Sequence, residues 1–201
     1  MTISFIVPTF KTPEQLVQRC IDSIRRFCAR YGVGLDLVIV RDEVILSAAR
    51  NIGLRRATGD WVWFVDGDDE VVCEGGIVGQ LEATRADILV FGIEQRWGRF
   101  GRKMLHLAHS GFRGVLGKEC LEKEARSVLL RSLCNKLIRR SFIEDNGLAL
   151  DEASEPCEDG IFIIRCLMGL CSGGWVCILA EVGEFVIQVL SVVGGGVDKR
   201  R

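Results

Sequence analysis

Three carboxylates packed into four residues are the strongest chemical signal in the chain. Asp66, Asp68 and Asp69 directly follow a short apolar run, Trp61–Val65. Such a run fits a strand covered on both faces, and ligands of open α/β sheets bind beyond the carboxyl ends of such strands. Carboxylates this close repel each other, and a hard divalent cation, Mg²⁺ or Mn²⁺, would neutralise them and could hold a diphosphate. The loop by itself also fits a solvated acidic turn.

A second acidic pair, Glu158-Asp159, directly precedes a very apolar segment, residues 161–170, which we expect to be a helix. A carboxylate at a helix N-terminus is stabilised as the anion by the helix dipole. An ionised carboxylate can act as a general base, but Glu and Asp are also favourable first-turn residues in any helix. The pair alone therefore leaves both interpretations open.

A helix and a strand must position the acidic loop. The stretch from Ser47 has apolar residues at near-helical spacing, with Ser47 as the expected N-cap and Gly59 as a left-handed residue at the end. Ile3–Val7 is the expected first strand. A helix should follow it, with Thr12 as N-cap and Pro13 at the first helical position.

The order of the remaining segments predicts an α/β fold. We expect a second strand at Leu35–Val40, a short helix after the acidic loop, and a third apolar strand at Ala86–Ile93. Further helices are expected at residues 118–130, before Gly147 and at 161–170. Residues 175–179 and 185–193 should form late strands, or a strand and a helix.

The residues from Ser47 to Asp69 resemble the core of family 2 glycosyltransferases with the GT-A fold. The resemblance rests on S-A-A-R-N-I-G-L, A-T-G-D and W-F-V-D-G-D-D, and similar segments include V-P-T-F-K, N-K-L-I-R-R and E-D-G-I-F. It covers most of residues 3–165. It implies a mostly parallel central sheet with flanking helices, in a single domain of residues 1–201. Residues 1–93 would bind the nucleotide-sugar, and residues 94–201 would form the acceptor side.

The resemblance also implies a reaction and a set of site residues. The reaction would be an inverting, metal-dependent transfer of a sugar from a nucleotide diphosphate donor, with UDP as the expected nucleotide, to an acceptor hydroxyl. Asp159 would be the catalytic base, and Asp68 would bind Mn²⁺ or Mg²⁺. The donor-binding residues would be Pro8 and Phe10 at the base, Asp42 on the uracil ring, Arg50, and Asp66 on the ribose.

The chain departs from the family pattern in four places. Phe10 replaces a tyrosine, Lys11 replaces an asparagine, and Arg41 replaces the first residue of an acidic pair. Relatives also have a helix and a strand between the positions of Asp42 and Ser47, which are nearly adjacent here. These departures keep a second interpretation open, in which the module binds a nucleotide-sugar or a partner without turnover.

A nucleotidyltransferase would also combine a parallel sheet, acidic metal ligands and a nucleotide. It would need a glycine-rich basic loop after the first strand to hold a triphosphate, and Pro8–Lys11 contains no glycine. This difference argues against that class.

Net charge, cysteine content and apolar runs limit the classes of partner and the cellular compartment that we expect for the protein. The net charge of −1 gives no indication of nucleic-acid binding, which usually needs a basic domain. The chain has nine scattered cysteines, which is an odd number, and no C-x-x-C pair. This pattern indicates reduced thiols. The sequence opens without a signal-peptide pattern, and its longest apolar run is too short to span a bilayer. We therefore expect a cytoplasmic protein, with peripheral contact at the inner membrane face left open.

The segment Arg96–Lys118 contains six basic and no acidic residues. It could bind phosphates of the donor or of a lipid-linked acceptor, and it could equally be a solvated β-hairpin. The expected partners are therefore a nucleotide-sugar donor and a glycan or lipid-linked acceptor.

Overall fold

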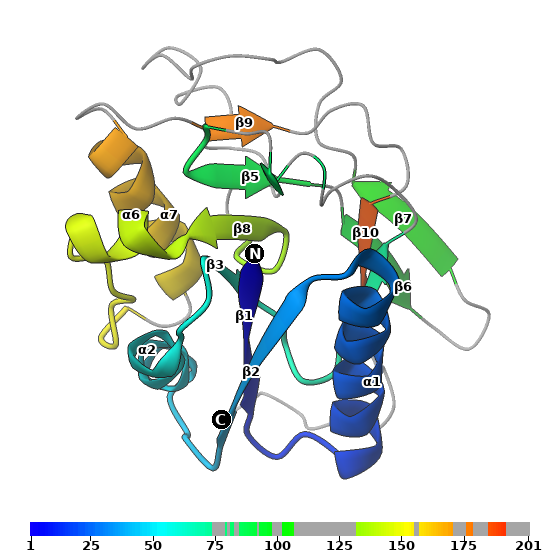
Figure 1. Ribbon diagram of the computed structural model, residues 1–201. Helices are drawn as coiled ribbons and strands as arrows, with labels where there is room; N and C mark the ends of the chain where they lie inside the picture. The colour runs from blue at the N-terminus through cyan, green and yellow to red at the C-terminus, as the bar shows by residue number, and fades with distance from the viewer. Residues whose placement is uncertain are drawn as a thin grey trace.

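A computed structural model describes residues 1–73, 79, 81–82, 85–91, 93–97, 102–106, 132–154, 157–170, 176–178 and 185–191. Its strands form a six-stranded sheet, in the order β2-β1-β3-β8-β5-β9, and a four-stranded sheet, in the order β4-β10-β6-β7 (Figure 1). The larger sheet contains β1 (Thr2–Thr9), β2 (Gly34–Arg41), β3 (Trp61–Phe64), β5 (Ile88–Val90), β8 (Lys136–Arg139) and β9 (Val176–Ile178). The smaller sheet contains β4 (Glu70–Cys73), β6 (Ile93–Trp97), β7 (Arg102–His106) and β10 (Phe185–Ser191). The helices are α1 (Glu14–Tyr31), α2 (Leu46–Arg56), α6 (Arg140–Asp145) and α7 (Glu158–Leu170).

The larger sheet is mostly parallel, as predicted. Strand β1 pairs in parallel with both β2 and β3, and β5 pairs in parallel with β9. Strand β8 is antiparallel to its neighbours β3 and β5. All four residues of β3 are buried, which confirms the prediction of a strand covered on both faces.

Aromatic side chains pack on both faces of this sheet. On the α1 face, the ring of Phe5 lies 6.0 Å from that of Phe27 and 5.4 Å from that of Trp63. On the other face, Phe64 of β3 lies 6.2 Å from Phe162 of α7. Helix α1 therefore covers one face, while α2 and α7 cover the other (Figure 1). Burying these rings supplies much of the energy that fixes β3 and the loop after it.

A glycine lets α2 lie close against β1. A Cβ on Gly53 would lie 2.2 Å from Cγ2 of Ile6, so a larger residue would push the helix away from the strand. The start of α2 differs from the prediction, because the helix begins at Leu46 and Ile45 is its N-cap. Ser47 lies inside the first turn, and its buried hydroxyl has no hydrogen-bond partner among the described residues.

The end of α2 also differs from the prediction. The C-cap is Ala57, in an extended conformation, and Gly59 is not left-handed. Gly59 is needed instead for a close approach, since a Cβ there would lie 2.7 Å from the backbone nitrogen of Ser4. The connection from α2 to β3 thus packs directly onto β1.

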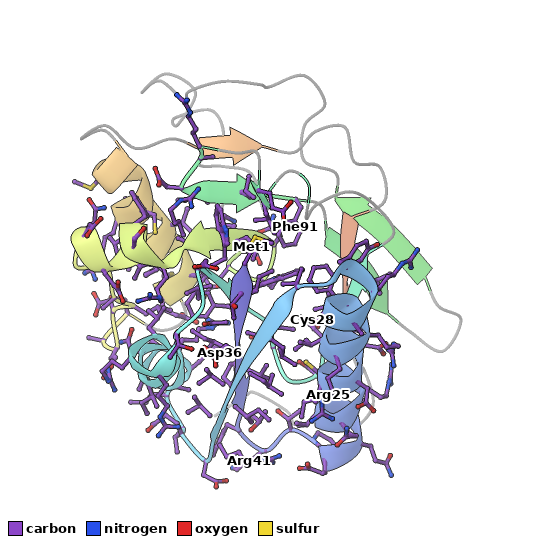
Figure 2. All side chains as sticks on the ribbon, viewed as in Figure 1. Met1, Arg25, Cys28, Asp36, Arg41 and Phe91 are labelled. Carbon is purple, nitrogen blue, oxygen red and sulfur yellow. The ribbon has the colours of Figure 1, made fainter. Side chains whose placement is uncertain are left out.

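Asp36 of β2 fixes the same connection from the other side. Its carboxylate accepts hydrogen bonds from Ser4 Oγ at 2.7 Å and from the amide and hydroxyl of Thr58 at 2.7 and 2.9 Å. Figure 2 shows Asp36 beside β2. Burial acts to raise the pKa of Asp36, but the hydrogen bonds from Ser4 and Thr58 outweigh it and lower the pKa.

One further prediction about the start of a helix was wrong. Helix α1 begins at Glu14, with Pro13 as its N-cap and no side-chain capping bond, so Thr12 is not the cap. Strand β4 directly follows the acidic loop and pairs antiparallel with the distant β10. The short helix expected between the loop and the next strand is supported by the helical conformation of the described residues 79 and 81–82. Strands β6 and β7 pair antiparallel, which fits the hairpin interpretation for the described part of Arg96–Lys118, residues 96–97 and 102–106. The rest of that segment lies outside the described residues. The expected helix at 118–130 lies outside the described residues.

The connection between β2 and α2 is short, as the sequence indicated. Residues 42–45 lead directly from one element to the other. Within the described part of the chain, β2 pairs only with β1 and is the edge of the larger sheet. Arg41 at the end of β2 pairs with Glu14 of α1 through two hydrogen bonds of 2.9 and 3.1 Å (Figure 2).

Candidate functional site

The acidic loop turns tightly at the carboxyl end of β3. The amide of Asp69 donates to the carbonyl of Asp66 at 2.9 Å, and Gly67 sits between them. A Cβ on Gly67 would lie 2.9 Å from Thr9 Cγ2, so a glycine is required for the loop to pack on the end of β1. Burial and the nearby charge of Asp66 both raise the pKa of Asp68. A cation bound here would relieve that repulsion.

A cavity of about 230 Å³ opens between the ends of β1, β2 and β3. Four of the residues expected to hold the donor or metal line it together: Pro8, Phe10, Asp66 and Asp68. Phe10 is 41% exposed, and the ammonium of Lys11 lies over its ring, 4.9 Å from the ring centroid. The cavity therefore combines an aromatic surface with two carboxylates that are hard oxygen ligands.

Asp42 does not line this cavity. It is exposed, and its φ of 64° places it in the left-handed region that residues with a Cβ rarely adopt. The next residue, Glu43, does line the cavity, and the sequence analysis had not singled it out. Lys11, on the opposite strand end, is also left-handed at φ 54°. Two strained residues thus flank the cavity, where such strain is often associated with function.

Arg50 joins the two acidic segments. Only 3% of its side chain is exposed, and it donates to Asp66 Oδ1 at 2.9 Å and to Asp159 Oδ1 at 2.5 Å. Glu158 Oε1 lies 3.6 Å from the same guanidinium. Burial acts to lower the pKa of Arg50, but the carboxylates of Asp66 and Asp159 outweigh it and raise the pKa. Arg50 is therefore a permanent buried cation shared by both segments.

Asp159 is held at both oxygens. Oδ1 accepts from Arg50, and Oδ2 accepts from the backbone amide of Leu133 at 3.3 Å. Burial raises the pKa of Asp159, Arg50 lowers it, and the charges of Asp66 and Glu158 raise it again, so that the net direction is upward. A carboxylate with a raised pKa is a stronger base once ionised, which suits proton abstraction.

The asparagine next to Arg50 has a structural role. Asn51 Nδ2 donates to the carbonyl of Leu150 at 3.0 Å, and the amide of Leu150 donates back to Asn51 Oδ1 at 2.9 Å. Asn51 also donates to Glu152 at 2.8 Å. One turn of α2 thus fixes the segment that leads toward α7, and with it the position of Asp159.

Asn135 and Lys136 are buried and do not face the cavity. Asn135 donates to the carbonyl of Phe91 at 2.8 Å, and Lys136 Nζ donates to the carbonyl of Ser132 and to Asn135 Oδ1. These contacts give both residues a structural role. The sequence signal that was overlooked is Lys136 itself, a charged residue directly before the apolar pair Leu137-Ile138 of β8.

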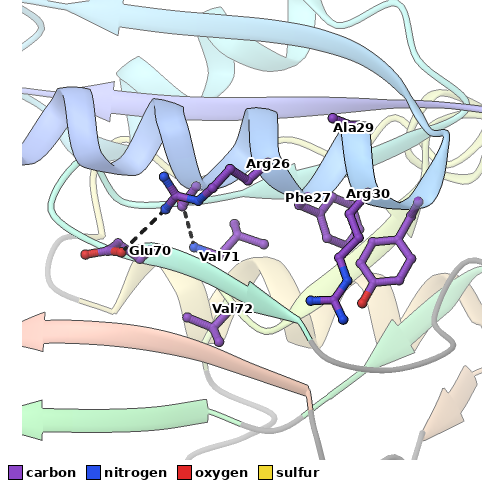
Figure 3. A pocket seen from close by; sticks show the side chains of 9 residues that line it. Arg26, Phe27, Ala29, Arg30, Glu70, Val71 and Val72 are labelled. Carbon is purple, nitrogen blue, oxygen red and sulfur yellow. Dashed lines mark hydrogen bonds and ion pairs between the residues drawn. The ribbon is translucent and has the colours of Figure 1, made fainter.

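A second cavity, of about 490 Å³, lies between α1 and β4 (Figure 3). Arg26 forms an ion pair with Glu70 at 4.0 Å across it, and the amide of Val71 donates to Ser23 Oγ at 2.9 Å. None of the predicted site residues lines this cavity.

The described residues contain no group of three or more His, Cys, Asp or Glu side chains that could hold a metal alone. A phosphate-bound Mg²⁺ or Mn²⁺ needs only one or two protein carboxylates, so Asp66 and Asp68 fit that kind of site. Five of the cysteines in the described part of the chain are free thiols: Cys20, Cys28, Cys134, Cys157 and Cys166. Within the same residues, no helix has the length and apolar character needed to cross a membrane.

Known proteins resemble this chain both in sequence and in fold. The family model described as glycosyl transferase family 2 matches residues 37–147. A search of curated protein sequences gave no match.

Solved structures show the same fold. S. aureus TarS 1-349 in complex with UDP-GlcNAc has a TM-score of 0.69 and 17% identity, over 100% of this chain and 62% of that chain. The complex of the same protein with UDP has a TM-score of 0.66 and 18% identity, over 94% and 61%. A mutant Drosophila β1,4-galactosyltransferase 7 with manganese, UDP-Gal and xylobiose has a TM-score of 0.55 and 14% identity, over 92% and 67%. The chain thus spans about three fifths of the TarS structures, and the shared fold is of the GT-A type.

Proposed function

This chain belongs to glycosyltransferase family 2, and on that premise we propose that it transfers a sugar from a UDP-sugar to an acceptor hydroxyl. The observation that carries the proposal is the bridge made by Arg50. It holds Asp66, at the cavity, and Asp159, the candidate base, within the span of one guanidinium. The bridge supports the proposal, because the base must lie close to the part of the site that holds the donor.

The donor would bind in the cavity beyond β1 and β3. Pro8 and Phe10 offer an apolar and aromatic surface to the nucleobase, and Asp66 would accept from the ribose hydroxyls. Asp68 would bind Mn²⁺ or Mg²⁺, and the bound ion would neutralise charge on the leaving diphosphate. The similar solved structures include complexes with UDP, with UDP-GlcNAc, and with manganese and UDP-Gal, which supports this donor class. Asp42 remains a candidate for the uracil ring, although it does not line the cavity.

Asp159 would take the proton of the acceptor hydroxyl. As that oxygen attacks the anomeric carbon, the bond from the carbon to the diphosphate oxygen breaks, and the diphosphate leaves with its electron pair. A single displacement inverts the anomeric carbon. The upward shift of the Asp159 pKa supports its role as the base.

The acceptor and the compartment are part of the same proposal. We assign residues 1–93 to donor binding and residues 94–201 to the acceptor side, with a glycan or lipid-linked acceptor in polysaccharide synthesis. The free thiols fit a reducing cytoplasm. The basic segment from Arg96 is a candidate for contact with acceptor phosphates at the inner membrane face.

The exposure of Asp42 and the short 42–45 connection favour one other function. A module without the full donor site could bind a nucleotide-sugar or a partner without turnover. Release of UDP from a panel of UDP-sugars, with and without glycan acceptors, separates the two functions. We expect Mn²⁺-dependent UDP release that Asp159→Asn abolishes. UDP binding without release from any donor would favour the non-catalytic function.

A further inference from the structure

We propose that Lys136 is a positioning residue for Asp159, acting through the turn formed by residues 132–135. The inference rests on the role proposed above for Asp159 as the base. It assigns Lys136 to the acid–base machinery of that site, although the side chain does not reach the cavity.

The 132–135 turn is the element that holds the second oxygen of Asp159. The backbone amide of Leu133, at the centre of the turn, donates to Asp159 Oδ2 at 3.3 Å. Arg50 already occupies Oδ1 at 2.5 Å. These two donors fix the plane of the carboxylate. A small rotation of the turn would release Oδ2 and change the direction in which the base faces the acceptor.

The buried side chain of Lys136 stabilises this turn by hydrogen bonds. Its ammonium donates to the carbonyl of Ser132 and, at 2.8 Å, to Asn135 Oδ1, so it joins both ends of the turn. Its own amide donates to the carbonyl of Leu133 at 3.2 Å. The side chain is 1% exposed.

The turn is also anchored to two strands. Trp63 Nε1 of β3 donates to the carbonyl of Cys134 at 2.7 Å. Asn135 exchanges hydrogen bonds with the backbone of Phe91, at 2.8 and 3.1 Å. The strands fix the outer side of the turn, and Lys136 fixes the side that faces α7 and Asp159.

A buried lysine would reduce the stability of the fold if it served only to fill space at this position. Burial lowers the pKa of Lys136 to about 7, while the negative charge of Asp159 acts in the opposite direction. Replacing a buried charge by an apolar side chain of similar volume is often neutral or stabilising. The cost is consistent with a functional role, and the charges that face the amine include Asp159 itself.

Two variants separate the positioning role from simple packing. Lys136→Met removes the charge and the hydrogen bonds, and Lys136→Gln keeps N–H donors without the charge. Ser132→Ala is the matched control, because it removes the hydroxyl bonded to Cys134 and keeps the carbonyl that Lys136 binds. We expect Lys136→Met to lower kcat about 10- to 100-fold, the range seen when a catalytic group is displaced slightly. KM for the donor should stay unchanged, and Lys136→Gln should retain more activity than Lys136→Met.

A second readout does not depend on turnover. The amide of Leu133, observed by NMR in ¹⁵N-leucine-labelled protein, should follow the titration of Asp159 in the wild type and in Ser132→Ala. In Lys136→Met it should lose that titration, and in Lys136→Gln, which keeps N–H donors, the titration should be weaker than in the wild type. If Lys136→Met does not fold, Lys136→Gln supplies the readout. A Leu133 amide that follows Asp159 to the full wild-type extent in the folded variants overturns the proposal, as does a loss of UDP affinity that equals the loss of kcat. A wild type that shows the titration but no sugar transfer would instead count against the proposed function.

Discussion

Arg50 lies 2.5 Å from Asp159, although 109 residues separate them, and its other terminal nitrogen contacts Asp66 of the acidic loop. Two segments that the sequence presents as unrelated acidic clusters thus share one buried cation. This bridge explains how several negative charges can lie together near the carboxyl end of β3 without unfolding the protein. It also makes the geometry of the base depend on the loop that binds the donor.

Loss of Arg50 should destabilise the fold. Arg50→Met leaves Asp66, Asp159 and Glu158 without their buried cation, so we expect a loss of about 3 kcal/mol in the free energy of unfolding at neutral pH. The loss should shrink in acid, as the carboxylates become protonated. Urea unfolding measures both values. Arg19→Met, at a half-exposed arginine that pairs with the partly buried Glu70, is the control and should cost less than about 1 kcal/mol. An equal cost for both variants would contradict the bridging role.

Asp159→Asn should remove the base without disturbing donor binding. We expect kcat to fall about 10²- to 10⁴-fold, the usual contribution of general base catalysis. The affinity for UDP should stay close to the wild-type value, because Arg50 still holds Asp66. Steady-state kinetics and calorimetry measure these quantities. Asp151→Asn, at a carboxyl bonded to Arg165, is the control.

The pH profile follows from the direction of the Asp159 pKa. Only the ionised carboxylate can accept a proton, so activity should rise with pH as Asp159 loses its own proton. Because the pKa of Asp159 is raised, this acid limb should lie above the pH at which an ordinary Asp titrates. An acid limb at the usual Asp value would show that another group controls the rate.

Gly53→Ala should destabilise the packing of α2 on β1. The new methyl group would lie 2.2 Å from Ile6 Cγ2, and overpacking of this kind costs about 1–3 kcal/mol. The double variant with Ile6→Ala removes the clash, so its cost should be smaller than the sum of the two single variants. Additive costs in urea unfolding would contradict the close approach.

Asp36→Ala should weaken the connection from α2 to β3. The carboxylate accepts three hydrogen bonds from Ser4 and Thr58, and we expect a loss of about 1–2 kcal/mol at neutral pH. The folded-state pKa of Asp36 is lowered, so its contribution is present above the ordinary Asp pKa and disappears as pH falls through the lowered value. The stability gap to wild type should therefore narrow in acid. Asp145→Ala, at an exposed carboxyl on α6, is the control and should cost little stability at neutral pH.

Local patterns were sufficient to predict the central part of the fold. The apolar run Trp61–Val65 and the acidic residues after it identified β3 and the loop at its end. A strand that is buried on both faces needs an unbroken run of apolar residues, and such a run is visible in the sequence. The first two strands and the helix before Gly147 were predicted for the same reason. The order of elements also indicated the short connection after Asp42, and the structure shows β2 at the sheet edge.

The errors come from contacts between distant residues. Strand β4 was not predicted, because its partner β10 lies more than 100 residues away and leaves no local pattern. Gly59 was interpreted as a helix-end residue, whereas its small size is needed against Ser4. Local pattern could also not show that Arg50 would reach Asp159, or that Glu43 rather than Asp42 would line the cavity.

Calorimetric titration of UDP, with and without Mn²⁺, is the most direct test of the donor site at the acidic loop. The account predicts that wild-type protein binds UDP only with Mn²⁺ and prefers it to GDP and CDP. Asp68→Asn should lose this binding, and the control Asp145→Asn, remote from the cavity, should keep it. Equal binding of UDP by wild type and Asp68→Asn, or no nucleotide binding under any metal condition, would contradict the account.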